Sequence, residues 1–233
     1  MGLARELPVF VRVERDGKVA LVHPEFSDTV AAALLEGEGC ELADEAGRAP
    51  LKRFSYSEGT GLIREYRRGG FVRHFMTKSY LFDNRPLHEI EVHCAAYRSG
   101  VAVPMPLGAY WERRGPIYRG AIAVARLEAV NLLDYLSGDA DGSEGKADAL
   151  RRCGAALRQM HDAGFVHADL QIRNILIAGD GPYIIDLDKA RQCTRVSPSA
   201  RQVNLVRLRR SLEKNGVLLK HFDAIRAGYE GHS

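Results

Sequence analysis

Two stretches of sequence decide the fold of this chain. They are FVHADLQIRNILI (residues 165–177) and, a few residues later, YIIDLD (residues 183–188). Two short apolar runs, at 174–177 and 183–185, flank a Gly-Asp-Gly turn. Short β-prone runs on both sides of such a turn predict a β-hairpin. Polar residues are concentrated at the two outer ends of this hairpin. We therefore expect the functional site at these ends.

The expected hairpin places three polar side chains near one another. Asn174 lies at the start of the first strand and Asp186 follows the second, so the two are expected side by side. Asp169 lies in the loop that leads into the hairpin. Phosphoryl transfer requires metal-held phosphates in line with a carboxylate that accepts a hydroxyl proton. The pattern therefore favours a kinase site.

The spacing of these residues resembles that of the protein-kinase catalytic loop. His167, Asp169 and Asn174 follow the order H-x-D-x-x-x-x-N, and Asp186-Leu187-Asp188 resembles the metal-binding D-F-G turn. The resemblance implies that Asp169 is the catalytic base and that Asn174 and Asp186 hold magnesium. Asp188 stands where protein kinases carry Gly, and it either binds a second metal or caps a turn. For His167 we expect a packed residue that supports the loop rather than a proton carrier.

The bulk composition is that of a globular protein. The chain has 233 residues, of which 45% are hydrophobic and 27% charged. This length permits one domain or two lobes that share a cleft. The formal net charge of +3 does not favour nucleic acid as a partner. Four scattered cysteines indicate neither a zinc site nor a disulfide framework.

The chain shows no signal-peptide core and no apolar run of transmembrane length. We therefore expect the protein in a reducing cytosol, and we expect any contact with a membrane to be peripheral. The sequence does not predict an oligomeric state.

A kinase also needs a cation near the α- and β-phosphates, oriented by a helix glutamate. The alternating residues 62–66 predict a strand, and Arg64 on it is the preferred cation, with Arg73 and Lys78 as competitors. Apolar spacing predicts a helix over 86–98, from which Glu89 could reach the cation.

Helical patterns dominate the second half of the chain. The spacing predicts a helix over 146–161, which delivers the chain to the catalytic loop. Two amphipathic helices follow Asp188. Their expected apolar stripes are Val203, Leu205, Leu208 and Leu212 in the first, and Phe222, Ile225 and Tyr229 in the second.

Further motifs narrow the resemblance to one family. In order, they are REYRRGGF (64–71), YLF (80–82), Glu89, GVAVPMP (100–106), HAD (167–169), NIL (174–176), IDLDK (185–189) and NLVRLRRSLEK (204–214). From about Gly47 onward, this set resembles the 3-deoxy-D-manno-octulosonic acid (Kdo) kinases of the lipopolysaccharide kinase family. Three positions depart from the expected pattern: Ala49 in place of Gly, Ala125 in place of Glu and His74 in place of a basic residue.

The resemblance implies an α+β, protein-kinase-like bilobal fold that uses ATP and Mg²⁺. The β-rich N-lobe is expected over 1–127 and a reduced, mainly helical C-lobe over 128–233. Gly47 and Arg48 begin a segment that could cover the phosphates of the nucleotide with backbone amides.

The implied acceptor is a Kdo residue of Kdo-lipid A, at the cytoplasmic face of the inner membrane of a Gram-negative cell. This acceptor is anionic, and guanidinium groups bind carboxylates in bidentate fashion. Arg67, Arg68 and Arg173 are the candidate substrate residues, although Arg173 could instead pair with a neighbouring carboxylate. Arg67, Arg68 and Arg73 are also expected to contact anionic membranes.

Two other classes of function remain open from the sequence. One is a small-molecule kinase of the aminoglycoside or choline type, and the other is a kinase-like pseudoenzyme that acts as a binding module. The joint presence of Asp169, Asn174 and Asp186 argues against the pseudoenzyme.

Overall fold

The computed structural model describes residues 7–43, 50–66, 84–115, 117–138 and 142–231. Its contacts divide the chain into two compact units. We call Leu7–Cys94 with Met105–Arg126 the strand-rich unit, and Ala95–Pro104 with Leu127–Ser233 the helical unit. The assignment of 1–127 and 128–233 to two kinase lobes stays a prediction.

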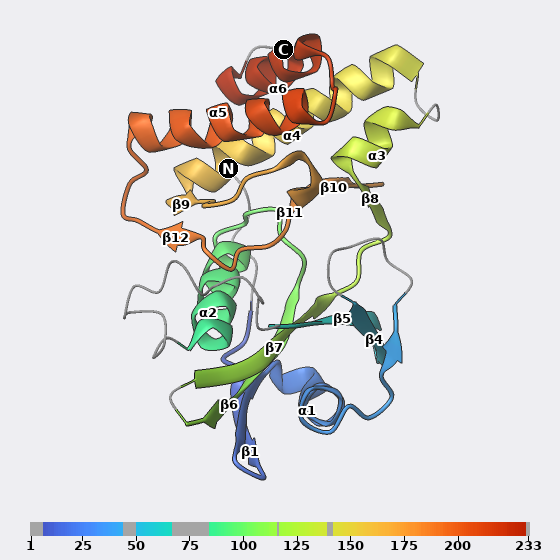
Figure 1. Cartoon of the computed structure of the whole chain (residues 1–233), viewed down its shortest axis with the longest axis vertical. Coiled ribbons are helices and arrows are strands. Elements are labelled where there is room, and N and C mark those ends of the chain that lie inside the picture. Colours follow the sequence, from blue (N-terminus) through green and yellow to red (C-terminus); the bar gives the residue numbers. More distant parts are fainter. Residues whose placement is uncertain (1–6, 44–49, 67–83, 116, 139–141, 232–233) are drawn as a thin grey trace. The chain divides into compact units, whose positions relative to one another are not determined.

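The strand-rich unit is built on one antiparallel sheet (Figure 1). Its strand order is β1-β2-β6-β7-β5-β4-β3. The strands are β1 (Val11–Arg15), β2 (Lys18–Val22), β3 (Glu41–Leu42), β4 (Leu51–Tyr56), β5 (Gly59–Glu65), β6 (Pro106–Arg114) and β7 (Ile117–Ala125).

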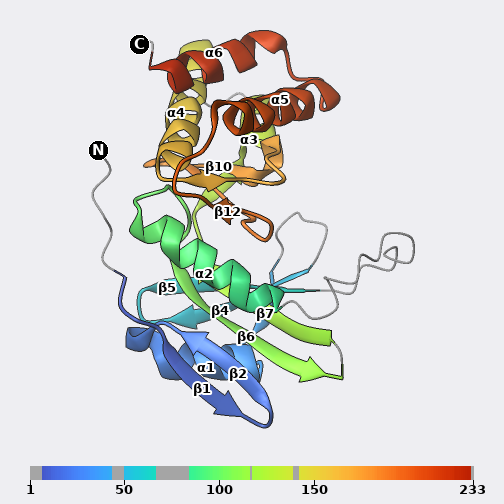
Figure 2. The ribbon, with the colours of Figure 1, turned by 90° about the vertical axis from the view of Figure 1, so that its left-hand side faces the viewer.

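Two helices cover opposite faces of this sheet, α1 (Ser27–Leu35) and α2 (Arg85–Arg98), as Figure 2 shows. Alternate residues of a strand point to opposite faces. On β7, Ala121 and Ala123 belong to the core that α1 completes, whereas Ile122 packs with Ile90 of α2. The period-2 pattern of one strand therefore serves both helices.

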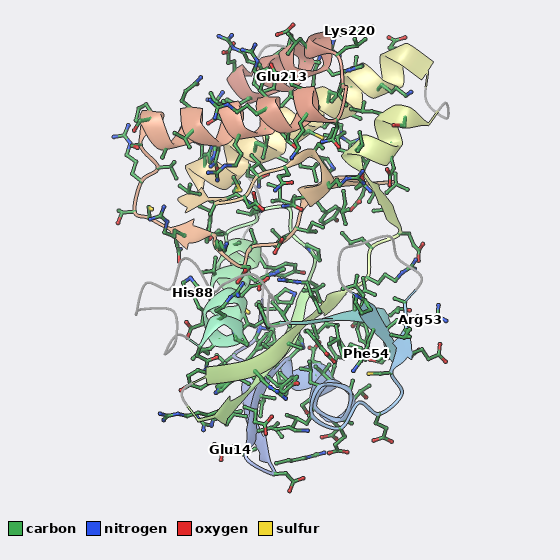
Figure 3. The ribbon with its side chains drawn as sticks, in the orientation of Figure 1. Glu14, Arg53, Phe54, His88, Glu213 and Lys220 are labelled. Atoms are coloured by element: carbon green, nitrogen blue, oxygen red, sulfur yellow. The ribbon has the colours of Figure 1, made fainter. Side chains whose placement is uncertain are left out.

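The same alternation can be followed on β4 in Figure 3, where Arg53 and Phe54 are labelled. Phe54 is 3% exposed, and its ring occupies the space beside Gly61, where an added Cβ would lie 2.4 Å from the ring. Arg53 is exposed and pairs with Glu41.

Strands β1 and β2 form an antiparallel hairpin, with Asp16 and Gly17 at φ 49° and 75° in its turn. Such values suit the turns that join twisted strands. A short 3₁₀ turn precedes α1. Ser27 is the first residue of α1 rather than its N-cap, because a short 3₁₀ turn, η1 (Pro24–Phe26), leads directly into the helix.

The described part of the helical unit contains the C-terminal end of α2, four further helices and short strands. The helices are α3 (Leu132–Ser137), α4 (Gly142–Asp162), α5 (Pro198–Lys214) and α6 (Leu219–Glu230). The strands are β8 (Ala129–Asn131), β9 (Phe165–Val166), β10 (Ile175–Ala178), β11 (Gly181–Ile184) and β12 (Arg191–Gln192), and the 3₁₀ turn η3 spans Ile172–Asn174. Strand β10 pairs with both β11 and β8, and β9 pairs with β12.

Helices α4 and α6 approach each other closely at two glycines. A Cβ on Gly154 would lie 1.9 Å from the Ile225 carbonyl, and one on Gly228 would lie 1.9 Å from the Arg151 carbonyl. No side chain fits there, so these two glycines set the packing distance.

The buried face of α5 differs from the predicted stripe by one residue. Leu205, Leu208 and Leu212 are buried as expected, but Val203 is 54% exposed and Asn204 is 1% exposed. A polar side chain therefore occupies the core position that the pattern gave to Val203.

Candidate active site

The β10–β11 hairpin brings the two expected metal ligands together. Ile175 pairs with Ile184, and the Ile185 N–H donates to the Asn174 carbonyl at 3.0 Å. Asp186 follows directly, so it lies at the same end of the hairpin as Asn174. Its φ of 65° is left-handed, a conformation that costs free energy for a residue other than Gly and recurs at functional sites.

A small cavity of about 80 Å³ lies at this end of the helical unit. It is lined by Asp169, Asp186, Asp188 and Lys189. The loop carboxylate and the carboxylate that follows the hairpin therefore face one space. The position of Asp188 on this cavity fits a role in the site as well as a role in the turn.

Three hydrogen bonds hold Asp169 in its loop. Gln171 Nε2 donates to Asp169 Oδ1 at 2.7 Å, and Asn174 Nδ2 donates to the Asp169 carbonyl at 2.9 Å. The Asp169 backbone N–H donates to His167 Nδ1 at 3.1 Å. These bonds fix the direction of the carboxylate while its side chain remains accessible to solvent.

His167 supports the loop from below. It is 1% exposed, and because its Nδ1 accepts a hydrogen bond, its Nε2–H donates to the Ile185 carbonyl at 3.0 Å. Burial lowers the pKa of His167, against the raising effects of that carbonyl and of the nearby Asp186 and Asp169. A neutral imidazole with both nitrogens engaged positions the loop and does not carry the reacting proton.

Asn204 of α5 joins this loop to the helices around it. Its Oδ1 accepts from the His167 backbone N–H and from His161 Nε2, both at 3.1 Å, and its Nδ2 donates to the His167 carbonyl at 2.9 Å. His161 Nδ1 in turn accepts from the Tyr229 hydroxyl at 2.8 Å. The side chains of α4, α5 and α6 thus form one neutral network that ends at the loop that carries Asp169.

The metal-binding capacity of this site is limited to few protein ligands. Among the described residues, no group of three or more His, Cys, Asp and Glu side chains could hold a metal ion. Such a small set of protein ligands suits Mg²⁺, because this ion is bound through one or two carboxylates together with waters and substrate phosphates. The amide nitrogen of Asn174 is used by Asp169, and among the described residues no donor occupies its oxygen, which could therefore bind a metal at the same end of the hairpin as Asp186. The residues therefore fit magnesium.

The strand-rich unit contains the expected cation and its glutamate. Arg64 on β5 donates to both carboxylate oxygens of Glu89 on α2, at 2.6 and 2.8 Å. The Tyr66 hydroxyl also donates to Glu89, and the Tyr66 ring lies 5.3 Å from the Arg64 guanidinium and 5.4 Å from that of Arg85. The Glu89 side chain is 3% exposed and that of Arg64 is 31% exposed, so the cation faces outward from a buried anchor.

Several predicted site residues cannot be placed in this way. Gly47, Arg48, Arg67 and Arg68 lie outside the described residues, as do the competing cations at 73 and 78. Arg173 is exposed, and its Nη1 lies 3.8 Å from Asp134 Oδ1, a loose contact that leaves its substrate role a prediction.

The predicted site residues do not include Gln171, Tyr66 or His161, and the bonding role of Asn204 was not predicted. One signal was available for Asn204, because it interrupts the apolar stripe of a helix at a position between buried leucines. For Gln171 and Tyr66 the sequence offers no periodic signal, since their partners are brought near only by tertiary folding.

In the part of the chain that the structure describes, no helix is long and apolar enough to cross a membrane.

Comparison with known proteins identifies the family. A sequence model of the lipopolysaccharide kinase (Kdo/WaaP) family matches residues 36–229. A 3-deoxy-D-manno-octulosonic acid kinase of Vibrio cholerae serotype O1 is 31% identical over 201 residues, which cover 84% of this chain and 83% of the relative. One of Stenotrophomonas maltophilia is 33% identical over 184 residues, or 76% and 72% of the two chains.

Among solved structures, WaaP in complex with acyl carrier protein superposes with a TM-score of 0.56 at 17% identity. The match covers 88% of this chain and 82% of that chain. The predicted α+β, kinase-like fold is confirmed. On its sequence and its fold, this chain is a member of the lipopolysaccharide kinase (Kdo/WaaP) family.

Proposed function

We propose that this protein transfers the γ-phosphoryl group of ATP to a hydroxyl of a Kdo residue in Kdo-lipid A. The observation that carries the proposal is the loop carboxylate Asp169, held beside Asp186 on one cavity in a member of this family. The identity of 31% to a Kdo kinase over most of both chains supports this acceptor.

In this proposal Asp169 is the catalytic base. Its Oδ1 is held by Gln171 and its backbone by His167, so the carboxylate is oriented before the acceptor arrives. It accepts the proton of the acceptor hydroxyl as that oxygen attacks phosphorus, which is the role that a positioned carboxylate plays in kinases. The neutral His167 beneath the loop takes no part in this proton transfer.

Asn174 and Asp186 would hold magnesium, and Arg64, oriented by Glu89, would bind the α- and β-phosphates of ATP. The bound Mg–ATP supplies the phosphoryl group, with its negative charge partly neutralised. We further propose that Gly47 and Arg48 cover the nucleotide and that Arg67, Arg68 and Arg173 bind the acceptor.

The proposed acceptor is anchored in a bilayer by lipid A, so the enzyme would work as a peripheral protein at the cytoplasmic face of the inner membrane. Arg67, Arg68 and Arg73 are the residues proposed for this contact, each contributing roughly 1 kcal/mol near an anionic surface. Co-sedimentation with anionic liposomes at low and high salt measures this contact directly.

The proposed activity is tested by side-by-side phosphotransfer assays with Mg–ATP and four acceptors: Kdo-lipid A, kanamycin, choline and a generic protein. Phosphate is expected on Kdo-lipid A alone, detected by mass spectrometry. Phosphate on kanamycin or choline but not on Kdo-lipid A would establish the small-molecule kinase instead. ATP binding without transfer to any acceptor would favour the pseudoenzyme.

A further inference from the structure

The chain after Asp188 is strongly basic. Residues 189–220 contain nine Lys and Arg against one acidic residue, Glu213, although the whole chain carries only +3. Most of this stretch is helix α5, which Figure 1 shows crossing the helical unit beside β9 and the segment that leads into β10. Glu213 and Lys220, labelled in Figure 3, mark its C-terminal end and the start of α6.

Helix α5 packs against both ends of the catalytic loop, at β9 before it and at η3 after it. Two side chains fix this contact. Asn204 bonds to the backbone of His167, and the Ser211 hydroxyl accepts from the Ile172 N–H at 3.1 Å. The loop between these points, which contains Asp169, therefore runs along the stretch of α5 between residues 204 and 211.

Arg207 lies in this stretch. On an α-helix it is rotated by about 60° from Asn204 and lies about 4.5 Å further along the axis. The next residue, Leu208, is fully buried, whereas Arg207 is partly buried, so Arg207 is at the rim of the face that holds the loop. Its positive charge acts on the loop, because it adds to the lowering of the pKa of His167 that burial causes.

Three other cations of this basic stretch lie beside carboxylates. Arg201 pairs with Asp162 at 2.6 Å, and Arg209 pairs with Glu213 at 2.9 Å. Lys189 lines the cavity that three aspartates share. Arg207, by contrast, has no carboxylate within ion-pair distance among the residues that the structure describes.

We infer that Arg207 binds an anionic group of the acceptor and thereby places the acceptor hydroxyl at Asp169. A partly desolvated guanidinium forms strong, bidentate hydrogen bonds with a carboxylate or a phosphate. The Kdo sugar carries a carboxylate and lipid A carries phosphates, so the acceptor supplies either group. This inference rests on the proposed function and names the residue that selects for an acidic acceptor.

The test compares Arg207→Met with Arg209→Met. Both variants remove one guanidinium from α5 and keep an unbranched apolar stem, but the two positions lie about 160° apart around the helix. Initial rates are measured with Kdo-lipid A and with ATP, and melting curves check that both variants fold. For Arg207→Met we expect a KM for Kdo-lipid A that is raised about 10-fold or more, with the KM for ATP unchanged. Arg209→Met is expected to match the wild type.

Arg207→Lys keeps the charge without the planar fork and is expected to give a smaller rise in the KM for Kdo-lipid A. Arg207→Lys also replaces Arg207→Met in this test if Arg207→Met does not fold. Equal acceptor KM values in the wild type, both Arg207 variants and Arg209→Met would overturn the inference. A rise in the KM for ATP instead would make Arg207 a nucleotide residue and overturn it as well.

Binding of Kdo-lipid A without ATP separates this inference from the proposed function. Arg207-dependent binding without phosphate transfer would contradict the function but support the site. Phosphate transfer with a KM for Kdo-lipid A that does not depend on Arg207 would support the function and contradict the site. Competition identifies the recognised group: free Kdo that inhibits the wild type more than Arg207→Met indicates the carboxylate, whereas an Arg207 effect that vanishes with dephosphorylated lipid A indicates a phosphate.

Discussion

The two units hold their key residues by opposite means. In the helical unit, the loop with Asp169 rests on a neutral network of His167, Asn204 and His161, all at most 1% exposed. In the strand-rich unit, Arg64 is held by the charged carboxylate of Glu89, and the guanidinium reaches solvent. The first arrangement is buried and uncharged, and the second is an ion pair whose cation is partly exposed.

The difference indicates different tasks. A fully bonded neutral network in the core contributes stability and fixes one geometry, because each of its unpaired groups would be costly. An ion pair between a buried carboxylate and a partly exposed guanidinium adds little net stability, since desolvation of the carboxylate offsets much of the Coulomb gain. It keeps a cation in place for an incoming anion. We therefore expect changes in the network to affect both folding and rate, and changes in the ion pair to affect mainly nucleotide binding.

The largest effect is expected for Asn204→Ala. The change leaves the His167 N–H and carbonyl and His161 Nε2 without partners in the core, which costs about 2–4 kcal/mol in the free energy of unfolding. Phosphotransfer should fall by about 10²-fold, because Asp169 loses its fixed position. Urea unfolding and initial rates measure the two effects.

Ser211→Ala is the matched control for the network. It removes one hydrogen bond at the other end of the loop and is expected to cost about 1 kcal/mol. If Asn204→Ala were no more destabilising than this control, the network would not be what holds the loop.

A smaller effect, on nucleotide binding, is expected for Glu89→Gln. The change keeps the shape of the side chain but releases Arg64, so the affinity for Mg–ATP should fall by about 10-fold while the melting temperature changes little. Glu65→Gln is the control, because Glu65 ends the strand that carries Arg64 and pairs with the exposed Lys52. Nucleotide titration measures the affinity for Mg–ATP. Equal affinity in both variants would mean that the ion pair does not support nucleotide binding.

The smallest effect is a dependence of stability on pH. Burial lowers the pKa of His161 and of His167 in the folded protein. As the pH falls through about 6.5, the unfolded chain takes up protons that the folded network does not, so the free energy of unfolding decreases. Urea midpoints at about pH 7.5 and pH 5.5 measure this difference. His88→Gln, at an exposed position of α2, should leave it unchanged. A midpoint that rises toward pH 5.5 would mean that the network is not neutral.

Short sequence patterns predicted the parts of the molecule whose structure depends on residues close together in the chain. The β10–β11 hairpin, with Asn174 and Asp186 at one end, follows from two apolar runs and a turn, and the pairing of Arg64 with Glu89 follows from a strand and a helix face. The network around Asn204 could not be predicted, because its partners come from α4, α6 and the loop and meet only in the folded core. The same reason applies to Tyr66, whose partners are Glu89 and two guanidiniums.

The most direct test of the account is phosphate transfer to Kdo-lipid A by the wild type and by Asp169→Asn, followed by mass spectrometry of the lipid. The variant keeps the size of the side chain and should retain its fold and its affinity for Mg–ATP. We expect phosphate on the lipid with the wild type and a rate lower by about 10²-fold or more with the variant. Transfer at a near-wild-type rate by Asp169→Asn would contradict the account, since the base would then lie elsewhere, with Asp188 the first residue to examine.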